Sequence, residues 1–164
     1  MTGLLPSELV ELARRVVIEN IAAGRTVALA ESCTGGLVCA ALTEIPGSSA
    51  VLDRGFVTYS NEAKLEALEV PRDIIDTLGA VSIATAWAMA QGALKHSQAD
   101  VAVAISGVAG PDGGTEQKPV GLVVFARAVR GSDDVFAEEH QLDAPDRSSV
   151  RLQAALVALE LLLP

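Results

Sequence analysis

The residues best suited to chemistry lie in the segment 30–36, Ala-Glu-Ser-Cys-Thr-Gly-Gly, where Ser32 and Cys33 are two potential nucleophiles. The apolar run 26–29 before it predicts a strand, and the run 37–42 after it predicts a helix. A turn between a strand and a helix leaves backbone N–H groups unpaired at the positive end of the helix dipole, which favours an anion. The segment therefore predicts either a nucleophilic, anion-binding turn or an ordinary helix cap.

A second candidate is Lys64, which falls in the first turn of a helix predicted over 62–68, after a strand at 55–59. A cation there faces the positive end of the helix dipole, at a cost of a few tenths of a kcal/mol to about 1 kcal/mol. The same field favours the neutral amine that a general base needs. Tyr59, the only tyrosine, lies close by. The alternative is a solvated helix lysine.

A third candidate is the loop 106–115, which holds four glycines in ten residues and follows an apolar strand predicted at 101–105. Glycines allow close backbone approach to a ligand, although neither a dinucleotide fingerprint nor a phosphate-loop ending is present. The loop predicts either phosphate or carboxylate binding or a glycine-rich surface. Arg147, beside Asp146 at a helix start, either reaches an anionic ligand or pairs with its neighbour or solvent.

Other kinds of chemistry find little support in the sequence. His96 and His140 lie far from the strand end that carries Ser32, so a Ser-His-Asp triad has no evident base. No His, Cys, Asp and Glu cluster has metal-ligand spacing, and we expect neither a metal nor an organic cofactor. Cys33 remains a rival nucleophile, but alternation through the turn predicts that its side chain is a small buried core residue.

Composition restricts the class of protein. The formal net charge of −9 argues against a nucleic-acid partner, which requires a basic face. The spacing of Cys33 and Cys39 suits neither a metal pair nor a disulfide, which indicates a reducing compartment. We see no signal peptide, and the apolar stretch 152–163 is too short to span a bilayer. We therefore expect a cytoplasmic protein with no membrane contact.

Strands that alternate with helices predict an α/β fold: a three-layer α/β/α sandwich with a mixed, mostly parallel sheet and a C-terminal β-hairpin, in one domain over 1–164. Ligands in such sheets gather beyond the carboxyl ends of strands, where all three candidate segments fall. The first expected element is a helix over 7–23, which is capped by Ser7, ended by Gly24 and buried along Val10, Ala13, Val17 and Ile21. The other expected elements are a loop at 46–49, a helical turn from Pro71, a helix at 83–96, strands at 120–129 and 135–142, and a helix from 146 onward.

The helix expected at 83–96 is rich in alanine and nearly apolar on every side. Such a helix is either buried in the core of its own chain or covered by another subunit. From this helix we expect a homo-oligomer, with a homodimer as the simplest form.

Together, five segments resemble the CinA C-terminal domain family, whose members include nicotinamide-nucleotide amidohydrolases. The matching segments follow the family's order over most of the chain: 30–36, 54–64, 79–82, 106–115 and 118–121. The resemblance implies a stand-alone amidohydrolase domain, without the additional N-terminal domain of longer CinA proteins.

The resemblance also implies an activity, the hydrolysis of the carboxamide of nicotinamide mononucleotide to nicotinate mononucleotide and ammonia. It implies Ser32 as nucleophile, with Lys64 acting directly or through Tyr59. We expect the pyridine nucleotide to be bound by Cys33, Thr34, Gly35, Gly36, Ser106, Gly107, Ala109, Gly110, Gly114, Thr115 and Arg147. The alternatives are a non-catalytic nucleotide-binding or assembly module, and an amidase for another small carboxamide.

Overall fold

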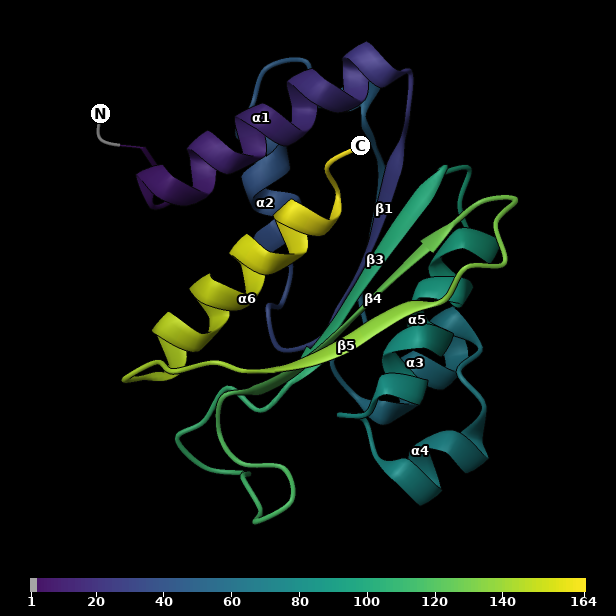
Figure 1. The fold of residues 1–164 in the computed structure, drawn as a ribbon, viewed down its shortest axis with the longest axis vertical. Helices are drawn as coiled ribbons and strands as arrows, with labels where there is room; N and C mark the ends of the chain where they lie inside the picture. Colours follow the sequence, from purple (N-terminus) through teal and green to yellow (C-terminus); the bar gives the residue numbers. More distant parts are fainter. Residues whose placement is uncertain (1–2) are drawn as a thin grey trace.

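The computed structural model describes residues 3–164 (Figure 1). Its elements, in chain order, are α1 (Ser7–Ala23), β1 (Val27–Glu31), α2 (Leu37–Thr43), the 3₁₀ helix η1 (Ser48–Ala50), β2 (Leu52–Val57), α3 (Asn61–Leu68), α4 (Arg72–Leu78), α5 (Ile83–Lys95), β3 (Val101–Gly107), β4 (Leu122–Val129), β5 (Phe136–Gln141) and α6 (Arg147–Leu161).

The strands form one five-stranded sheet in the order β2-β1-β3-β4-β5. Strand β1 pairs in parallel with β2 and β3, whereas β4 pairs antiparallel with β3 and β5. Four strands therefore share one direction and β4 opposes them, so the predicted mixed sheet and C-terminal hairpin are confirmed.

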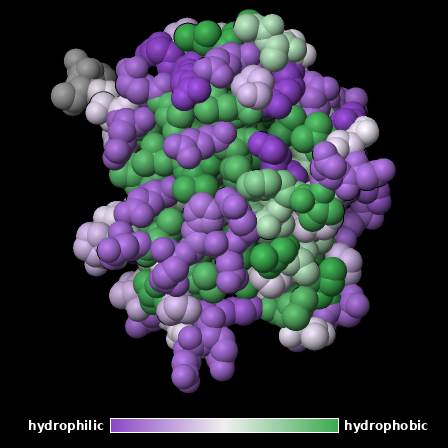
Figure 2. Space-filling model, viewed as in Figure 1, coloured by the Kyte–Doolittle hydropathy of each residue, from purple (hydrophilic) through white to green (hydrophobic). Residues whose placement is uncertain are grey.

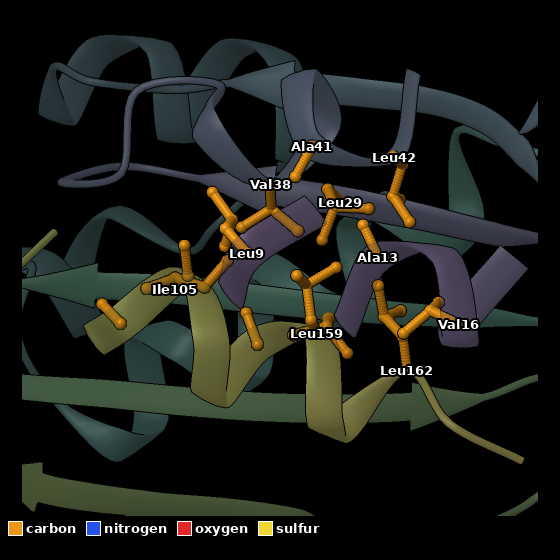
Figure 3. Packing of buried hydrophobic residues seen from close by; sticks show 14 of the residues in the cluster. Leu9, Ala13, Val16, Leu29, Val38, Ala41, Leu42, Ile105, Leu159 and Leu162 are labelled. Carbon is orange, nitrogen blue, oxygen red and sulfur yellow. The ribbon is translucent and has the colours of Figure 1, made fainter. Parts of the chain in front are cut away.

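The two faces of the sheet carry side chains of different size, which explains the three layers. One face presents large residues such as Leu29, Ile105 and Phe125, and these pack under α1, α2 and α6 (Figures 1 and 3). The other face presents mainly alanines, such as Ala30 and Ala104, to the helices α3, α4 and α5. Strict alternation along each strand places the two sets on opposite faces.

The alanine-rich helix α5 packs within its own chain against the alanine face of the sheet, because small residues on both sides allow close approach. A Cβ added at Gly92 would lie 2.1 Å from the carbonyl oxygen of Leu68, so α5 also fits tightly against the end of α3. Much of the apolar surface of α5 is therefore covered by its own chain, although Ile83 at its start is 44% exposed. The expected homo-oligomer stays a prediction.

Three local expectations differ from the structure. The cap of α1 is Pro6, and its buried stripe is shifted to include Leu9 and Asn20, whereas Ile21 is 49% exposed. Asn20 belongs inside because its side-chain amide donates to the carbonyl oxygens of Val16 and Leu162. Gly24 ends α1 in the left-handed conformation, as predicted.

The strand expected at 55–59 lies earlier, at Leu52–Val57, because pairing with β1 begins with Leu52 opposite Val27. The segment expected as a loop at 46–49 runs into the short helix η1. This shift moves Thr58 and Tyr59 out of the strand and into the connection that precedes α3.

On the face seen in Figure 2, hydrophilic side chains are interspersed with broad hydrophobic areas. Large exposed hydrophobic residues include Val57 and Tyr59, at the carboxyl end of β2. Within residues 3–164, no helix combines the length and hydrophobicity that a membrane crossing requires.

Candidate active site

The carboxyl ends of β1, β2 and β3 meet at one edge of the sheet. Glu31, the last residue of β1, lies opposite Ile105 of β3. The N–H of Ser32 donates to the carbonyl of Ile105 at 2.9 Å, and the N–H of Thr58 donates to the carbonyl of Glu31 at 2.9 Å. The residues that follow the three strands therefore converge where open α/β sheets bind their ligands.

Lys64 is buried in this region, with 1% of its surface exposed. Helix α3 is capped by Ser60, whose hydroxyl accepts the N–H of Ala63. The Nζ of Lys64 lies 3.0 Å from the Oγ of Ser32, as expected if the lysine serves the nucleophile rather than solvent. It also lies 2.7 Å from the carbonyl oxygen of Thr58 and 3.3 Å from that of Tyr59.

These contacts define what a neutral Lys64 can do. The carbonyl oxygens of Thr58 and Tyr59 can only accept, so they take both N–H groups of a neutral amine. The lone pair then faces the Oγ of Ser32, which donates its proton toward it. Burial lowers the pKa of Lys64, an effect larger than the opposing attraction of the neighbouring Cys33. Geometry and desolvation together suit this lysine to act as a base.

The turn after β1 is filled by a carboxylate of the protein itself. Glu31, fully buried, accepts hydrogen bonds from the hydroxyl of Thr34 at 2.6 Å and from the N–H of Gly36 at 3.0 Å. It also accepts the N–H groups of Val38 and Cys39. The N-terminus of α2, expected to be open to an anionic ligand, is therefore occupied by Glu31.

Three residues expected to bind substrate serve the turn instead. Thr34, Gly35 and Gly36 do not line the cavity described below. Thr34 is fully buried, and the glycines have φ values of 60° and 98°, a left-handed region that other residues rarely adopt. These residues therefore shape the backbone around Ser32, which corrects the expectation of direct ligand contact.

Cys33 is 5% exposed and belongs to the core under α1, α2 and α6, as predicted. Burial raises the pKa of the Cys33 thiol to about 11, so it stays protonated at neutral pH. The activated thiol considered as a rival nucleophile is therefore disfavoured, and Ser32 remains.

An open cavity of about 300 Å³ lies beside Ser32 and Lys64. The sequence-based candidates that line it are Ser32, Cys33, Tyr59, Lys64, Ser106, Gly107, Ala109, Gly110 and Arg147. Gly114 and Thr115, expected to contact the ligand, lie outside its lining. The N–H of Thr115 donates instead to the carbonyl of Lys118, which closes the exposed tip of the loop.

Five lining residues were absent from the sequence-based candidates: Ala80, Val81, Val108, Asp112 and Gly113. Ala80 reaches the cavity because the hydroxyl of Ser106 donates to its carbonyl oxygen at 2.8 Å, which ties the start of α5 to the end of β3. The resemblance of the segment 79–82 was the available signal for Ala80 and Val81. Asp112 and Gly113 lay inside the loop already singled out.

Arg147, the first residue of α6, lines the cavity and joins two of its other lining residues. Its guanidinium donates to the carbonyl oxygen of Gly110 at 2.6 Å and to the hydroxyl of Tyr59 at 3.0 Å. Tyr59 thus points its hydroxyl toward Arg147 and offers only its carbonyl oxygen to Lys64. This arrangement favours direct proton transfer from Ser32 to Lys64 over a route through Tyr59.

The histidines lie elsewhere. His96 contacts Glu69, and His140 contacts Glu138, and neither histidine lines the cavity. Within residues 3–164, no three His, Cys, Asp or Glu side chains gather as ligands for a metal ion.

Comparisons with known proteins identify the family of the chain. Residues 9–164 match the CinA C-terminal domain. Nicotinamide-nucleotide amidohydrolase PncC of Escherichia coli (strain K12) is 49% identical over 156 residues, which cover 95% of this chain and 93% of that protein. A relative from Symbiobacterium thermophilum is 53% identical over 143 residues, and the matched region spans 33% of its length.

Among solved structures, the competence/damage inducible protein CihA from Agrobacterium tumefaciens superposes with a TM-score of 0.94 at 49% identity. The match covers 98% of this chain and 97% of that one. Sequence and fold thus agree over nearly the whole length. The chain belongs to the CinA C-terminal domain family.

Proposed function

We propose that this protein is an amidohydrolase that converts nicotinamide mononucleotide to nicotinate mononucleotide and ammonia. The observation that carries the proposal is the 3.0 Å contact between the Oγ of Ser32 and the Nζ of a buried Lys64. The Escherichia coli relative, nicotinamide-nucleotide amidohydrolase PncC, supplies the substrate class.

In the first step, the Oγ of Ser32 attacks the carboxamide carbon while neutral Lys64 takes the hydroxyl proton. Lys64 then returns this proton to the leaving nitrogen, so that ammonia departs and an ester of Ser32 remains. The N–H of Cys33, next to the nucleophile, is the natural donor to the oxyanion, and one such donor is worth about 3 to 4 kcal/mol.

In the second step, Lys64 takes a proton from water, and the resulting hydroxide attacks the ester carbonyl. The bond to Ser32 breaks, the Oγ regains its proton from Lys64, and nicotinate mononucleotide leaves. Each step begins and ends with a neutral Lys64, so depression of its pKa supports both halves of the reaction.

The other end of the ligand would be held by Arg147 and the loop at Gly110 and Gly113. A guanidinium recognises phosphate by charge-assisted hydrogen bonds. The chain carries a net charge of −9, so a nucleotide needs such a local cation to approach. Anchoring the phosphate would align the amide with Ser32.

The test is release of ammonia from nicotinamide mononucleotide, nicotinamide and NAD by the purified protein. We expect turnover with the mononucleotide and a loss of roughly 10³-fold or more in kcat for Ser32→Ala, as for other serine hydrolases. Ser7→Ala is the matched control, because Ser7 is an exposed serine at the start of α1 and does not line the cavity. Wild-type protein that releases no ammonia from the mononucleotide would refute the proposal.

Two further expectations belong to this proposal. Cys33 and Cys39 are free thiols, which supports a cytoplasmic enzyme. Self-association as a homodimer or higher homo-oligomer remains a prediction. Light scattering at micromolar concentration tests it, because the mass of a single chain would contradict it.

A further inference from the structure

Arg151 is a cation from a distant part of the chain that contacts the turn between β1 and α2, which carries Ser32. It lies on α6, 118 residues beyond Cys33, and its Nε donates to the carbonyl oxygen of Cys33 at 3.1 Å. Its Nη2 donates to the carbonyl oxygen of Thr34 at 2.9 Å. One planar guanidinium therefore holds two successive peptide groups of the turn.

Each of these bonds orients an N–H group. In a trans peptide the C=O and N–H point in opposite directions. The bond to the carbonyl of Cys33 therefore turns the N–H of Thr34 away from α6. The bond to the carbonyl of Thr34 aims the N–H of Gly35 at the carbonyl of Ser32, which accepts it at 2.9 Å. The carbonyl of Ser32 and the N–H of Cys33 belong to the same peptide group, so this contact also fixes the direction of the N–H of Cys33.

The opposite side of the turn is held by Glu31, through the hydroxyl of Thr34 and the N–H of Gly36. Between the hydrogen bonds from Arg151 and those to Glu31, the N–H groups of Cys33 and Thr34 donate to no oxygen atom of residues 3–164. Of these two residues only Cys33 lines the cavity, whereas Thr34 is fully buried, so the N–H of Cys33 is the uncommitted donor that a ligand can meet.

We propose that Arg151 is a positioning residue, which holds the turn so that the backbone N–H of Cys33 points at the oxyanion formed when Ser32 attacks. This inference rests on the amidohydrolase function proposed above. Arg151 does not line the cavity that holds Ser32 and Lys64, so it acts through the turn rather than on the substrate. Its loss should therefore reduce kcat and leave KM almost unchanged.

Chemical rescue separates this role from a general structural one. Arg151 is half-buried and borders a second open cavity of about 270 Å³, together with Pro6, Leu37 and Leu152. In Arg151→Ala, guanidinium or ethylguanidinium from solvent can enter the vacated space and donate to the same two carbonyls. Arg151→Lys keeps the positive charge but lacks the planar guanidinium that donates to both carbonyls, so we expect its kcat to stay close to that of Arg151→Ala.

The experiment measures kcat and KM of Arg151→Ala with nicotinamide mononucleotide, with and without added ethylguanidinium. We expect kcat to fall by about 10- to 100-fold, KM to change by less than about threefold, and ethylguanidinium to restore at least about fivefold in kcat. Arg15→Ala, an exposed arginine on α1, is the matched control, and Ser32→Ala should not respond to ethylguanidinium.

A kcat of Arg151→Ala within about twofold of wild type would overturn the inference, as would a reduced kcat that ethylguanidinium leaves unchanged in protein with a wild-type melting temperature. Either result leaves the proposed function standing, because wild-type protein and Ser32→Ala test that separately. Absence of turnover in the wild type would instead refute the proposed function.

Discussion

The two walls of the cavity differ in how firmly the protein holds them. On one wall, Ser32 and Lys64 are buried, and the turn between β1 and α2 is bonded to Glu31 on one side and Arg151 on the other. On the other wall, residues 111–117 of the loop between β3 and β4 are exposed, and the contact between Gly110 and Arg147 ties its base to α6.

This difference suits one wall to proton transfer and the other to recognition of the phosphate. Proton transfer needs atoms held at a fixed distance, and the buried wall provides it with side chains that have no room to move. Recognition of a phosphate tolerates adjustment, and an exposed loop with glycines can close around it. We therefore expect changes in the buried wall to reduce kcat and changes in the loop wall to raise KM.

The largest expected effect comes from Lys64, because the buried wall depends on a neutral amine. Lys64→Met removes the base, and Lys64→Arg keeps a charge that cannot be released. We expect both variants to lose roughly 10³-fold or more in kcat with KM within a few fold. A Lys64→Arg variant that keeps most of its turnover would show that charge rather than proton transfer matters.

The pH dependence sharpens the same point. Burial lowers the pKa of Lys64 below its usual 10.5, so kcat/KM should rise with pH through that lowered value. In the same window the unfolded chain still binds the lysine proton and the folded chain does not. The free energy of unfolding contributed by Lys64 should therefore increase with pH there. Denaturant titrations of wild type and Lys64→Met at several pH values should show this difference.

Arg147 offers the next effect, on the loop wall. Arg147→Met removes a guanidinium whose hydrogen bond to a phosphate is worth about 1.5 to 3 kcal/mol, so KM should rise about 10- to 100-fold. We expect kcat to fall by less than about fivefold, because Ser32 and Lys64 keep their contact. Arg72→Ala, an exposed arginine at the start of α4, is the matched control. A loss confined to kcat would place Arg147 in the chemistry rather than in binding.

The smallest effect is expected for Cys33, which neighbours the nucleophile but points into the core. Cys33→Ala should keep kcat within about threefold, because only the backbone N–H of this residue serves the reaction. Because burial raises the pKa of the thiol to about 11, iodoacetamide should modify Cys33 slowly at neutral pH and faster as the pH approaches that value. Mass spectrometry follows the modification. Stoichiometric labelling of Cys33 at pH 7.5 with parallel loss of activity would contradict this.

Much of the framework follows from short-range patterns in the sequence. The almost continuous apolar run of β3 predicts a central strand covered on both faces, and Ser60 and Ser82 cap α3 and α5. Because parallel strands end at one edge, the segments that carry Ser32, Lys64 and Ser106 could be placed together before any coordinates. Composition alone does not show which surface covers the apolar helix α5, and the structure shows that the sheet of its own chain covers much of it.

Tertiary structure alone decided which atoms of those segments face the cavity. No local rule shows that Glu31 turns inward to occupy the N-terminus of α2, or that Arg151 closes over the turn from 118 residues away. Both contacts join groups whose separation depends on how whole helices pack on the sheet. The sequence alone thus predicts which segments meet around Ser32, whereas the direction of each N–H group there depends on packing between distant elements.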